Sequence, residues 1–123
     1  MKFRMAVVGL GLLAMAGGAQ AEGDAAKGEK VFKKCLACHV ATEPVNKVGP
    51  NLHGLIGRKA ASVEGYKYSA AMQESGIVWD DATMAAYLEN PRKVLPKTRM
   101  AFPGLKKADQ RDDVIAYLKS VTQ

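Results

Sequence analysis

The stretch Cys35-Leu36-Ala37-Cys38-His39 decides how the rest of this chain is interpreted. Two thiols separated by two residues and followed directly by an imidazole form the C-x-x-C-H signature at which a c-type haem is attached. Residues three and four apart share a face of a helical turn, so both thiols can reach the haem vinyl groups while His39 faces the iron. The motif therefore predicts one haem c, bound covalently through Cys35 and Cys38, with His39 as an axial iron ligand.

Other uses of a C-x-x-C pair remain open at this point. Such a pair can act as a redox dithiol or as half of a zinc site, but neither use explains the adjacent histidine. The only other histidine is His53, and its separation from His39 lies outside the usual H-x(3 to 5)-H spacing of zinc sites. In an exported chain the two cysteines could also form a disulfide, although haem attachment would consume both thiols.

Residues 1 to 21 have the pattern of a secretory signal peptide. Two basic residues form a positive n-region, residues 5 to 16 form an apolar core, and Ala19-Gln20-Ala21 forms an A-x-A cleavage site. The apolar core is short for a membrane span, and the alternative is an uncleaved N-terminal anchor. We expect a signal peptide over 1–21 and one soluble domain over 22–123, exported to the periplasm.

The charge of the chain is unevenly distributed. It has 18 Lys and Arg against 12 Asp and Glu, a formal net charge of +6. The segment from Pro91 to Ala108 contains six of these basic residues and no acid, and Lys33 and Lys34 stand beside the haem motif. A one-sided field steers an acidic partner toward a basic face. Any single lysine is equally compatible with ordinary solvated surface, and the absence of a recognised nucleic-acid-binding motif argues against nucleic acid.

Apolar spacing and capping residues predict about four helices and no convincing strand, which indicates a single all-α domain whose small core is completed by the haem. The segments Val40–Ser62 and Pro91–Gly104 are rich in proline, glycine or basic residues, and we expect them to be irregular. We expect a first helix from about Asp24 to Cys35, and a short second helix that is capped by Ser69, runs through Met72 and is ended by Gly76. A third helix should start at a cap on Asp80 and stop at Asn90-Pro91. The last helix should start at Asp109.

Motifs in the same order along nearly the whole mature region make the chain resemble class I cytochromes c, of the mitochondrial and bacterial cytochrome c2 type. A G-x-x-x-F pattern precedes C-x-x-C-H, and GPNLHGLIGR, YLENPRK, TRMAFPGLKK and DVIAYLK follow it. The resemblance implies a helical shell around haem c in which Gly28 and Phe32 pack on the last helix near Tyr117 and Leu118. It also implies Met100 as the second axial ligand, and a soft thioether in that position favours reduced iron.

The resemblance assigns roles to further residues around the cofactor. Pro50 offers its carbonyl to the far ring nitrogen of His39, which fixes the ring. His53 is not a ligand in the family, and Met72 and Met84 are interpreted as core. Met72 and Lys97 depart from the mitochondrial pattern, in which asparagine and glycine are usual. The remaining cofactor-binding positions are Arg58, Tyr68 and Trp79 around the propionates, and Tyr87 and Thr98 beside Met100, with simple core packing as the alternative for the aromatic residues.

With His39 and Met100 filling both axial positions, we expect an electron carrier and not an enzyme. The resemblance implies a soluble periplasmic monomer that cycles between iron(II) and iron(III), carrying electrons from a cytochrome bc1 complex to a terminal oxidase or a photosynthetic reaction centre. A haem peroxidase or gas-binding cytochrome would need a weak or absent sixth ligand, and a zinc or disulfide protein would carry no haem. The basic rim expected to meet these membrane-bound complexes consists of Lys34, Lys47, Arg92, Lys93, Arg99 and Lys106.

Overall fold

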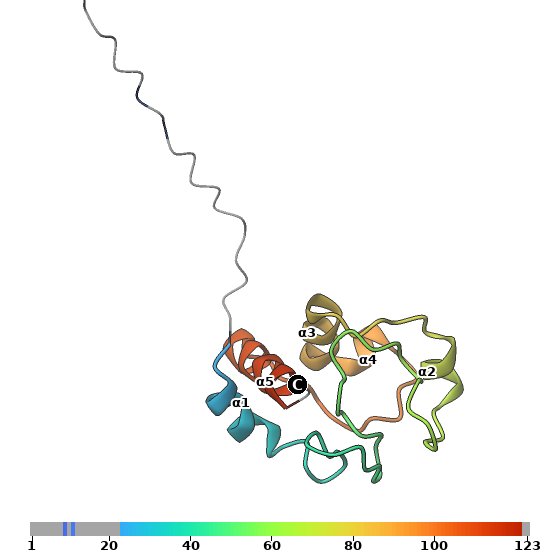
Figure 1. Ribbon diagram of the computed structural model, residues 1–123. Coiled ribbons are helices and arrows are strands. Elements are labelled where there is room, and N and C mark those ends of the chain that lie inside the picture. Colours follow the sequence, from blue (N-terminus) through green and yellow to red (C-terminus); the bar gives the residue numbers. More distant parts are fainter. Residues whose placement is uncertain (1–8, 10, 12–22, 122–123) are drawn as a thin grey trace, which may run out of the picture.

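Short helices joined by long loops make up the part of the chain that the computed structural model describes, residues 9, 11 and 23–121 (Figure 1). Between these described residues there is a single isolated bridge, Lys59 to Val78, and no strand. The all-α prediction is therefore confirmed. The helices are α1 (Ala25–Phe32), α2 (Ala70–Glu74), α3 (Asp81–Glu89), α4 (Pro91–Val94) and α5 (Ala108–Ser120).

The two ends of the described domain are joined by packing of α1 against α5 (Figure 1). Gly28 allows this close approach, since a Cβ there would overlap the Asp113 carbonyl and lie 2.8 Å from the Tyr117 Cβ. The ring of Phe32 lies 5.3 Å from that of Tyr117, measured between centroids. The Asp24 N–H also donates to Asp113 Oδ1 at 2.8 Å. The packing that the resemblance implied for Gly28 and Phe32 is present.

Helix α3 begins as its sequence predicts. The Asp80 carboxylate caps it by accepting the Thr83 N–H at 2.8 Å. Trp79 before the cap and Met84 in the helix are both buried, in keeping with a hydrophobic staple. Helix α3 packs on both α4 and α5. It therefore links the α1–α5 pair to the short helix that follows α3 in the chain.

The segment from Pro91 to Gly104 is not irregular throughout, so that prediction is partly wrong. Asn90 ends α3, but its side chain also accepts the Lys93 N–H at 3.3 Å. Pro91 occupies the first helical position, where its missing N–H costs no hydrogen bond and its fixed φ suits a helix. The residues that stop α3 therefore start α4.

Other helix ends differ from expectation by one to three residues. Helix α1 ends at Phe32, because the following amides bond three residues back, as in Cys35 N–H to Phe32 O at 2.8 Å. Helix α2 continues past Met72 to Glu74. Helix α5 begins at Ala108, and Lys107 before it provides no side-chain cap.

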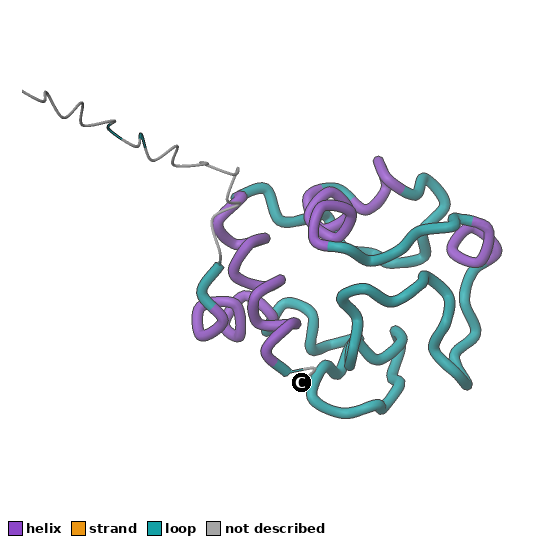
Figure 2. Tube along the Cα trace, turned by 45° about the horizontal axis from the view of Figure 1, so that its top comes forward, coloured by secondary structure: helices purple, strands orange, loops and turns teal. Residues whose placement is uncertain are grey.

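Loops form most of the half of the molecule away from α1 and α5 (Figure 2). Residues 57–60 and 77–79 run together there, with Gly57 N–H to Trp79 O at 2.7 Å and Trp79 N–H to Arg58 O at 2.9 Å. This pairing places Arg58 and Trp79 next to each other, beside the cavity described below.

The signal-peptide prediction falls on residues 1–21, of which the structure describes only Gly9 and Gly11. It stays a prediction. Over the described residues, no helix combines the length and the apolar character needed to cross a bilayer.

Candidate functional site: a haem cavity

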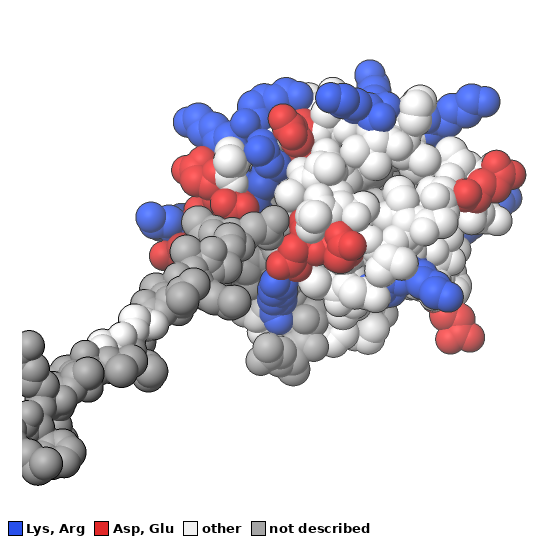
Figure 3. Space-filling view, turned by 90° about the horizontal axis from the view of Figure 1, so that it is seen from above, with Lys and Arg blue, Asp and Glu red and all other residues white. Residues whose placement is uncertain are grey.

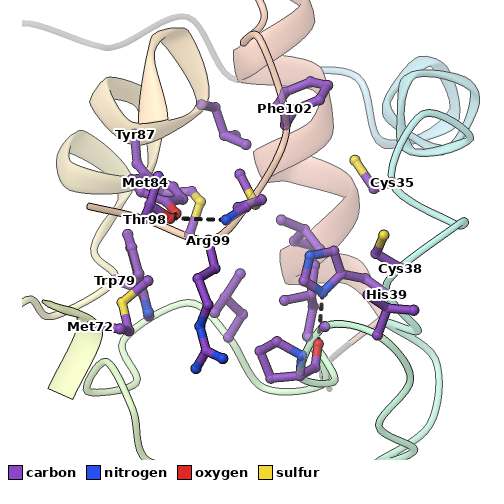
Figure 4. Close-up of a pocket in the computed structure, with 18 of the residues that line it drawn as sticks. Cys35, Cys38, His39, Met72, Trp79, Met84, Tyr87, Thr98, Arg99 and Phe102 are labelled. Atoms are coloured by element: carbon purple, nitrogen blue, oxygen red, sulfur yellow. Dashed lines mark hydrogen bonds between the residues drawn. The ribbon is translucent and has the colours of Figure 1, made fainter. Parts of the chain in front are cut away.

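A cavity of about 610 Å³ lies between α5, α3 and the long loops. This volume falls within the range typical of ligand and cofactor sites. The four residues predicted to hold the haem and its iron, Cys35, Cys38, His39 and Met100, all line it. Figure 4 shows the two thiols and His39 on one side and Trp79, Tyr87 and Met72 on the other. The six predicted cofactor-binding residues Pro50, Arg58, Tyr68, Trp79, Tyr87 and Thr98 line the same cavity.

Cys35 and Cys38 are free thiols on the turn that follows α1. Burial raises the pKa of Cys35 to about 11. The positive charge of Lys34 lowers this pKa by a smaller amount, and the neighbouring Cys38 raises it further. A redox dithiol needs the opposite, a lowered pKa that supplies thiolate at neutral pH. The described residues also contain no cluster of three or more His, Cys, Asp or Glu side chains able to hold a metal ion. Both alternatives for the C-x-x-C pair thus lose support.

His39 presents one ring nitrogen to the cavity and uses the other for a structural hydrogen bond. Its Nδ1 lies 2.7 Å from the Pro50 carbonyl oxygen, and because a carbonyl only accepts, Nδ1 must carry the proton. Burial lowers the pKa of His39, opposed by the Pro50 hydrogen bond and aided by the charge of Arg58. A neutral ring protonated at Nδ1 leaves the Nε2 lone pair free, which is the form that ligates a metal.

Gly49 allows the chain to pass directly beside this ring. A Cβ at position 49 would overlap the His39 Cε1 and lie 2.8 Å from Nδ1. The Gly49 N–H donates to the Cys38 carbonyl at 2.8 Å. The loop is thereby fixed to the haem motif itself, and Pro50 is held where its carbonyl meets His39.

Met100 lies in an irregular loop whose conformation is fixed by Thr98. The Thr98 hydroxyl is 2.8 Å from the Tyr87 hydroxyl and accepts the Met100 N–H at 3.3 Å (Figure 4). Burial raises the pKa of Tyr87, partly offset by its hydrogen bond to Thr98, so the phenol stays neutral. Tyr87 thus connects the Met100 loop to α3.

Arg58 carries an unsatisfied donor at the cavity. Two of its guanidinium nitrogens donate to the carbonyls of His53 and Asn51, at 3.1 and 3.0 Å. Its Nε is buried and has no hydrogen-bond partner. Buried donors are normally satisfied, and a haem propionate is an anion that would satisfy this one. The unsatisfied donor, the mostly apolar cavity and the thiol and imidazole donors all fit a haem.

Sequence reasoning assigned Met72 and Met84 to the core, but both also line the cavity. Helical spacing shows that a side chain is buried and does not show whether it faces protein or cofactor. His53 does not line the cavity; its Nδ1 lies 3.1 Å from the Ala41 carbonyl oxygen. This is consistent with its exclusion as a ligand.

The six residues of the predicted basic rim are all exposed, but they are not equivalent. Lys34 and Arg99 line the cavity. Lys47 donates to the Leu36 carbonyl at 2.8 Å and Lys106 to the Glu89 carbonyl at 3.1 Å. Figure 3 shows basic side chains along the upper edge of one face, with small acidic groups on the same face. On that face the two signs of charge are therefore not fully separated.

Comparison with known proteins agrees with this site. The family model described as cytochrome c matches residues 25–122. The chain belongs to the cytochrome c family. A cytochrome c from Gibberella zeae is 55% identical over 105 residues, covering 84% of this chain and 99% of that protein. The cytochrome c type-1 of Ascaris suum is 52% identical, covering 80% and 88% of the two chains. The structure of cytochrome cH from Methylobacterium extorquens is 46% identical, with a TM-score of 0.76, covering 80% of this chain and 99% of that one.

Membership of the cytochrome c family identifies the chain as an electron carrier with a covalent haem c, and Cys35 and Cys38 are the two cysteines that attach it. The predicted fold and cofactor are confirmed. The roles of the individual residues around the haem stay predictions, each with the geometry given above.

Proposed function

We propose that this cytochrome is exported to the periplasm and carries electrons from a cytochrome bc1 complex to a terminal oxidase or photosynthetic reaction centre, without enzymatic activity of its own. The observation that carries the proposal is that His39 and Met100 line one cavity, the imidazole with a free Nε2 and the thioether on a loop fixed by Thr98. The bound haem supplies a one-electron iron(II)/iron(III) couple, with a potential raised by a thioether ligand.

The protein would hold both proposed iron ligands in place. Pro50 fixes the His39 ring from one side, and Tyr87 and Thr98 fix the Met100 backbone from the other. With the His39 imidazole and the Met100 thioether both bound, the haem iron would have no open coordination position for peroxide or oxygen, which is why we propose a carrier and not a peroxidase. Phe102 and Ala101 also line the cavity and help to exclude water on the Met100 side.

The basic rim supports transient docking at membrane-bound redox complexes. Lys34 and Arg99 stand at the cavity itself, so charge steering brings a partner to the haem and not to a remote surface. Redox encounters of this kind bury little area and dissociate quickly. The periplasmic location rests on the sequence of residues 1–21.

A visible and near-infrared spectrum of the exported protein, with its intact mass, tests the proposal. We expect the mass of residues 22–123 plus one haem, and in the oxidised protein the weak near-infrared band that reports sulfur bound to ferric haem. Purified bc1 complex should reduce the protein and an oxidase or reaction centre should oxidise it. Rapid peroxide turnover, or absence of the sulfur band, would contradict the proposal.

A further inference from the structure

The turn that carries the haem motif, residues 33–38, is not followed by a helix. The last carbonyls of a helical turn have no following N–H to accept from, so their donors must come from elsewhere. Within the turn, the Cys35 carbonyl accepts the N–H groups of Cys38 and His39, at 3.1 and 2.9 Å. The carbonyls of Leu36 and Cys38 lie beyond these bonds and accept from a different segment.

A neighbouring loop supplies those donors. The Lys47 ammonium donates to the Leu36 carbonyl and the Gly49 N–H to the Cys38 carbonyl, both at 2.8 Å. The Lys47 N–H itself donates to the Gly49 carbonyl at 3.0 Å, which makes a tight turn and holds the two donors close together. A lysine side chain can bond the last carbonyls of a helix, whose partial negative charge favours a cation. This loop therefore caps the haem turn.

The same loop fixes the His39 ring. The Pro50 carbonyl lies 2.7 Å from His39 Nδ1 (Figure 4), and the Val48 carbonyl accepts the Tyr66 hydroxyl at 2.8 Å. A shift of the loop relative to the haem turn would move the Pro50 carbonyl away from the ring. The Lys47 bond is made by a charged side chain, so substitution can remove it without altering the backbone.

We propose that Lys47 is a positioning residue whose ammonium caps the haem turn at the Leu36 carbonyl and thereby keeps the His39 ring in a fixed orientation at the iron. Lys47 is exposed and belongs to the predicted basic rim, but a charge that only steers a partner needs no bond within the molecule. In this role Lys47 acts on the haem ligand and not on docking alone. The inference rests on the proposed function, because it takes His39 as an iron ligand.

Amide hydrogen exchange of the ferrous haem protein measures how often the loop leaves the turn, since the Gly49 N–H exchanges when its bond to Cys38 breaks. We expect that amide to exchange roughly threefold to tenfold faster in Lys47→Gln, the effect of losing about one net hydrogen bond. Lys47→Arg retains a cationic donor and should restore most of the protection. Lys33→Gln is the matched control: Lys33 is exposed beside the same motif, and its side chain makes no hydrogen bond within the described residues.

Electron paramagnetic resonance of the ferric protein reports the orientation of the His39 ring, because the g values of a low-spin haem depend on the plane of an axial imidazole. These g values should shift or broaden in Lys47→Gln and stay unchanged in Lys33→Gln. The amide of Leu118, in α5, is the internal reference for unfolding of the whole domain and should change little.

Equal Gly49 exchange in Lys47→Gln and Lys33→Gln would overturn the inference, as would unchanged g values in Lys47→Gln or a Lys47→Arg protein that exchanges as fast as Lys47→Gln. Equal acceleration at Gly49 and Leu118 would also overturn it, because it means a general loss of stability.

If Lys47→Gln fails to mature, NMR of the unaltered protein decides. A Lys47 ammonium that exchanges with solvent as fast as that of Lys33 then overturns the inference. Failure of the proposed function has a different signature, since the unaltered protein would lack the near-infrared sulfur band while the exchange comparison still holds.

Discussion

At the level of single residues, Gly49 sets the position of the His39 ring. Gly49→Ala should push the ring away from the Pro50 carbonyl, because the added Cβ overlaps the imidazole. We expect a loss of about 1–3 kcal/mol in the free energy of unfolding, as for other overpacked sites, together with a shifted haem spectrum. Denaturant titration and visible spectroscopy measure these effects. Gly65→Ala is the comparison: Gly65 has φ +76° and open space around it, so that variant should lose stability without a change in spectrum.

Met100 is one of three thioethers in the cavity, with Met72 and Met84. Met100→Ala should leave the haem covalently attached, abolish the near-infrared sulfur band, open the iron to added ligands and lower the potential. Met72→Leu and Met84→Leu should keep the band, since both residues belong to helices. Persistence of the band in Met100→Ala, combined with its loss in either control, would contradict the ligand assignment.

Ala61 is the non-glycine residue with positive φ in the described chain, at +59°. A residue with a Cβ loses about 1–2 kcal/mol of stability in this left-handed region. Glycine avoids that strain, but it loses more backbone entropy on folding than alanine does, which costs about 0.5–1 kcal/mol. Ala61→Gly should therefore raise the free energy of unfolding by roughly 0.5–1 kcal/mol. Equilibrium unfolding of the haem protein measures this difference. A decrease in stability would show that the turn is not strained.

At the level of helices, the contact between α1 and α5 depends on Gly28. Gly28→Ala should separate the two helices, because its Cβ would overlap backbone atoms of Asp113 that cannot rotate away. Overpacking of this kind costs about 1–3 kcal/mol, to be measured by denaturant unfolding. Glu29→Ala, an exposed position on the same helix, should change stability much less. Equal effects of the two variants would mean that the helices adjust freely at this contact.

Structural features that depend only on residues adjacent in the sequence could be predicted from the sequence. The carboxylate cap at Asp80 and the buried pair Trp79 and Met84 identify the start of α3 from a few adjacent positions. The short helix α4 was missed because Asn90-Pro91 is at once a stop signal and a start signal. Only packing of the following turn on α3 decides between the two.

The same distinction applies to the site. The C-x-x-C-H motif predicts three haem contacts within five residues, and the family resemblance adds Met100 and Pro50 as predictions. The bonds of Tyr66 to Val48 and of Arg99 to Lys67 span 18 and 32 residues and join loops without periodicity. No pattern in a single sequence marks such contacts. The sequence therefore predicted only a docking role for Arg99. The structure shows that its guanidinium also donates a hydrogen bond to the Lys67 carbonyl.

For the whole molecule, electron transfer to a bc1 complex or oxidase should slow as salt increases. Ions screen the attraction between rim and partner over about 8–10 Å at ordinary ionic strength. Lys34→Glu should lower the bimolecular rate, because Lys34 stands at the cavity, and should leave the potential nearly unchanged. Stopped-flow kinetics measure the rate.

Lys27→Glu on α1 is the matched control for this charge reversal. Lys27 is exposed and does not line the cavity, and an acid in the first turn of a helix suits its dipole. Lys119 is less suitable, because it is paired with Asp81. If Lys27→Glu slows the reaction as much as Lys34→Glu does, then net charge is responsible and the rim is not a localised docking surface.

The pairing of α1 with α5 also bears on the timing of folding. Translation makes α1 among the first residues of the domain and α5 among the last, so a growing chain lacks the partner of its first helix until synthesis is nearly complete. Joining segments this far apart costs loop-closure entropy that no earlier contact can offset. The core of the domain is therefore completed only when its last helix is available, and until then the α1–α5 contact cannot enclose the turn that carries the two thiols.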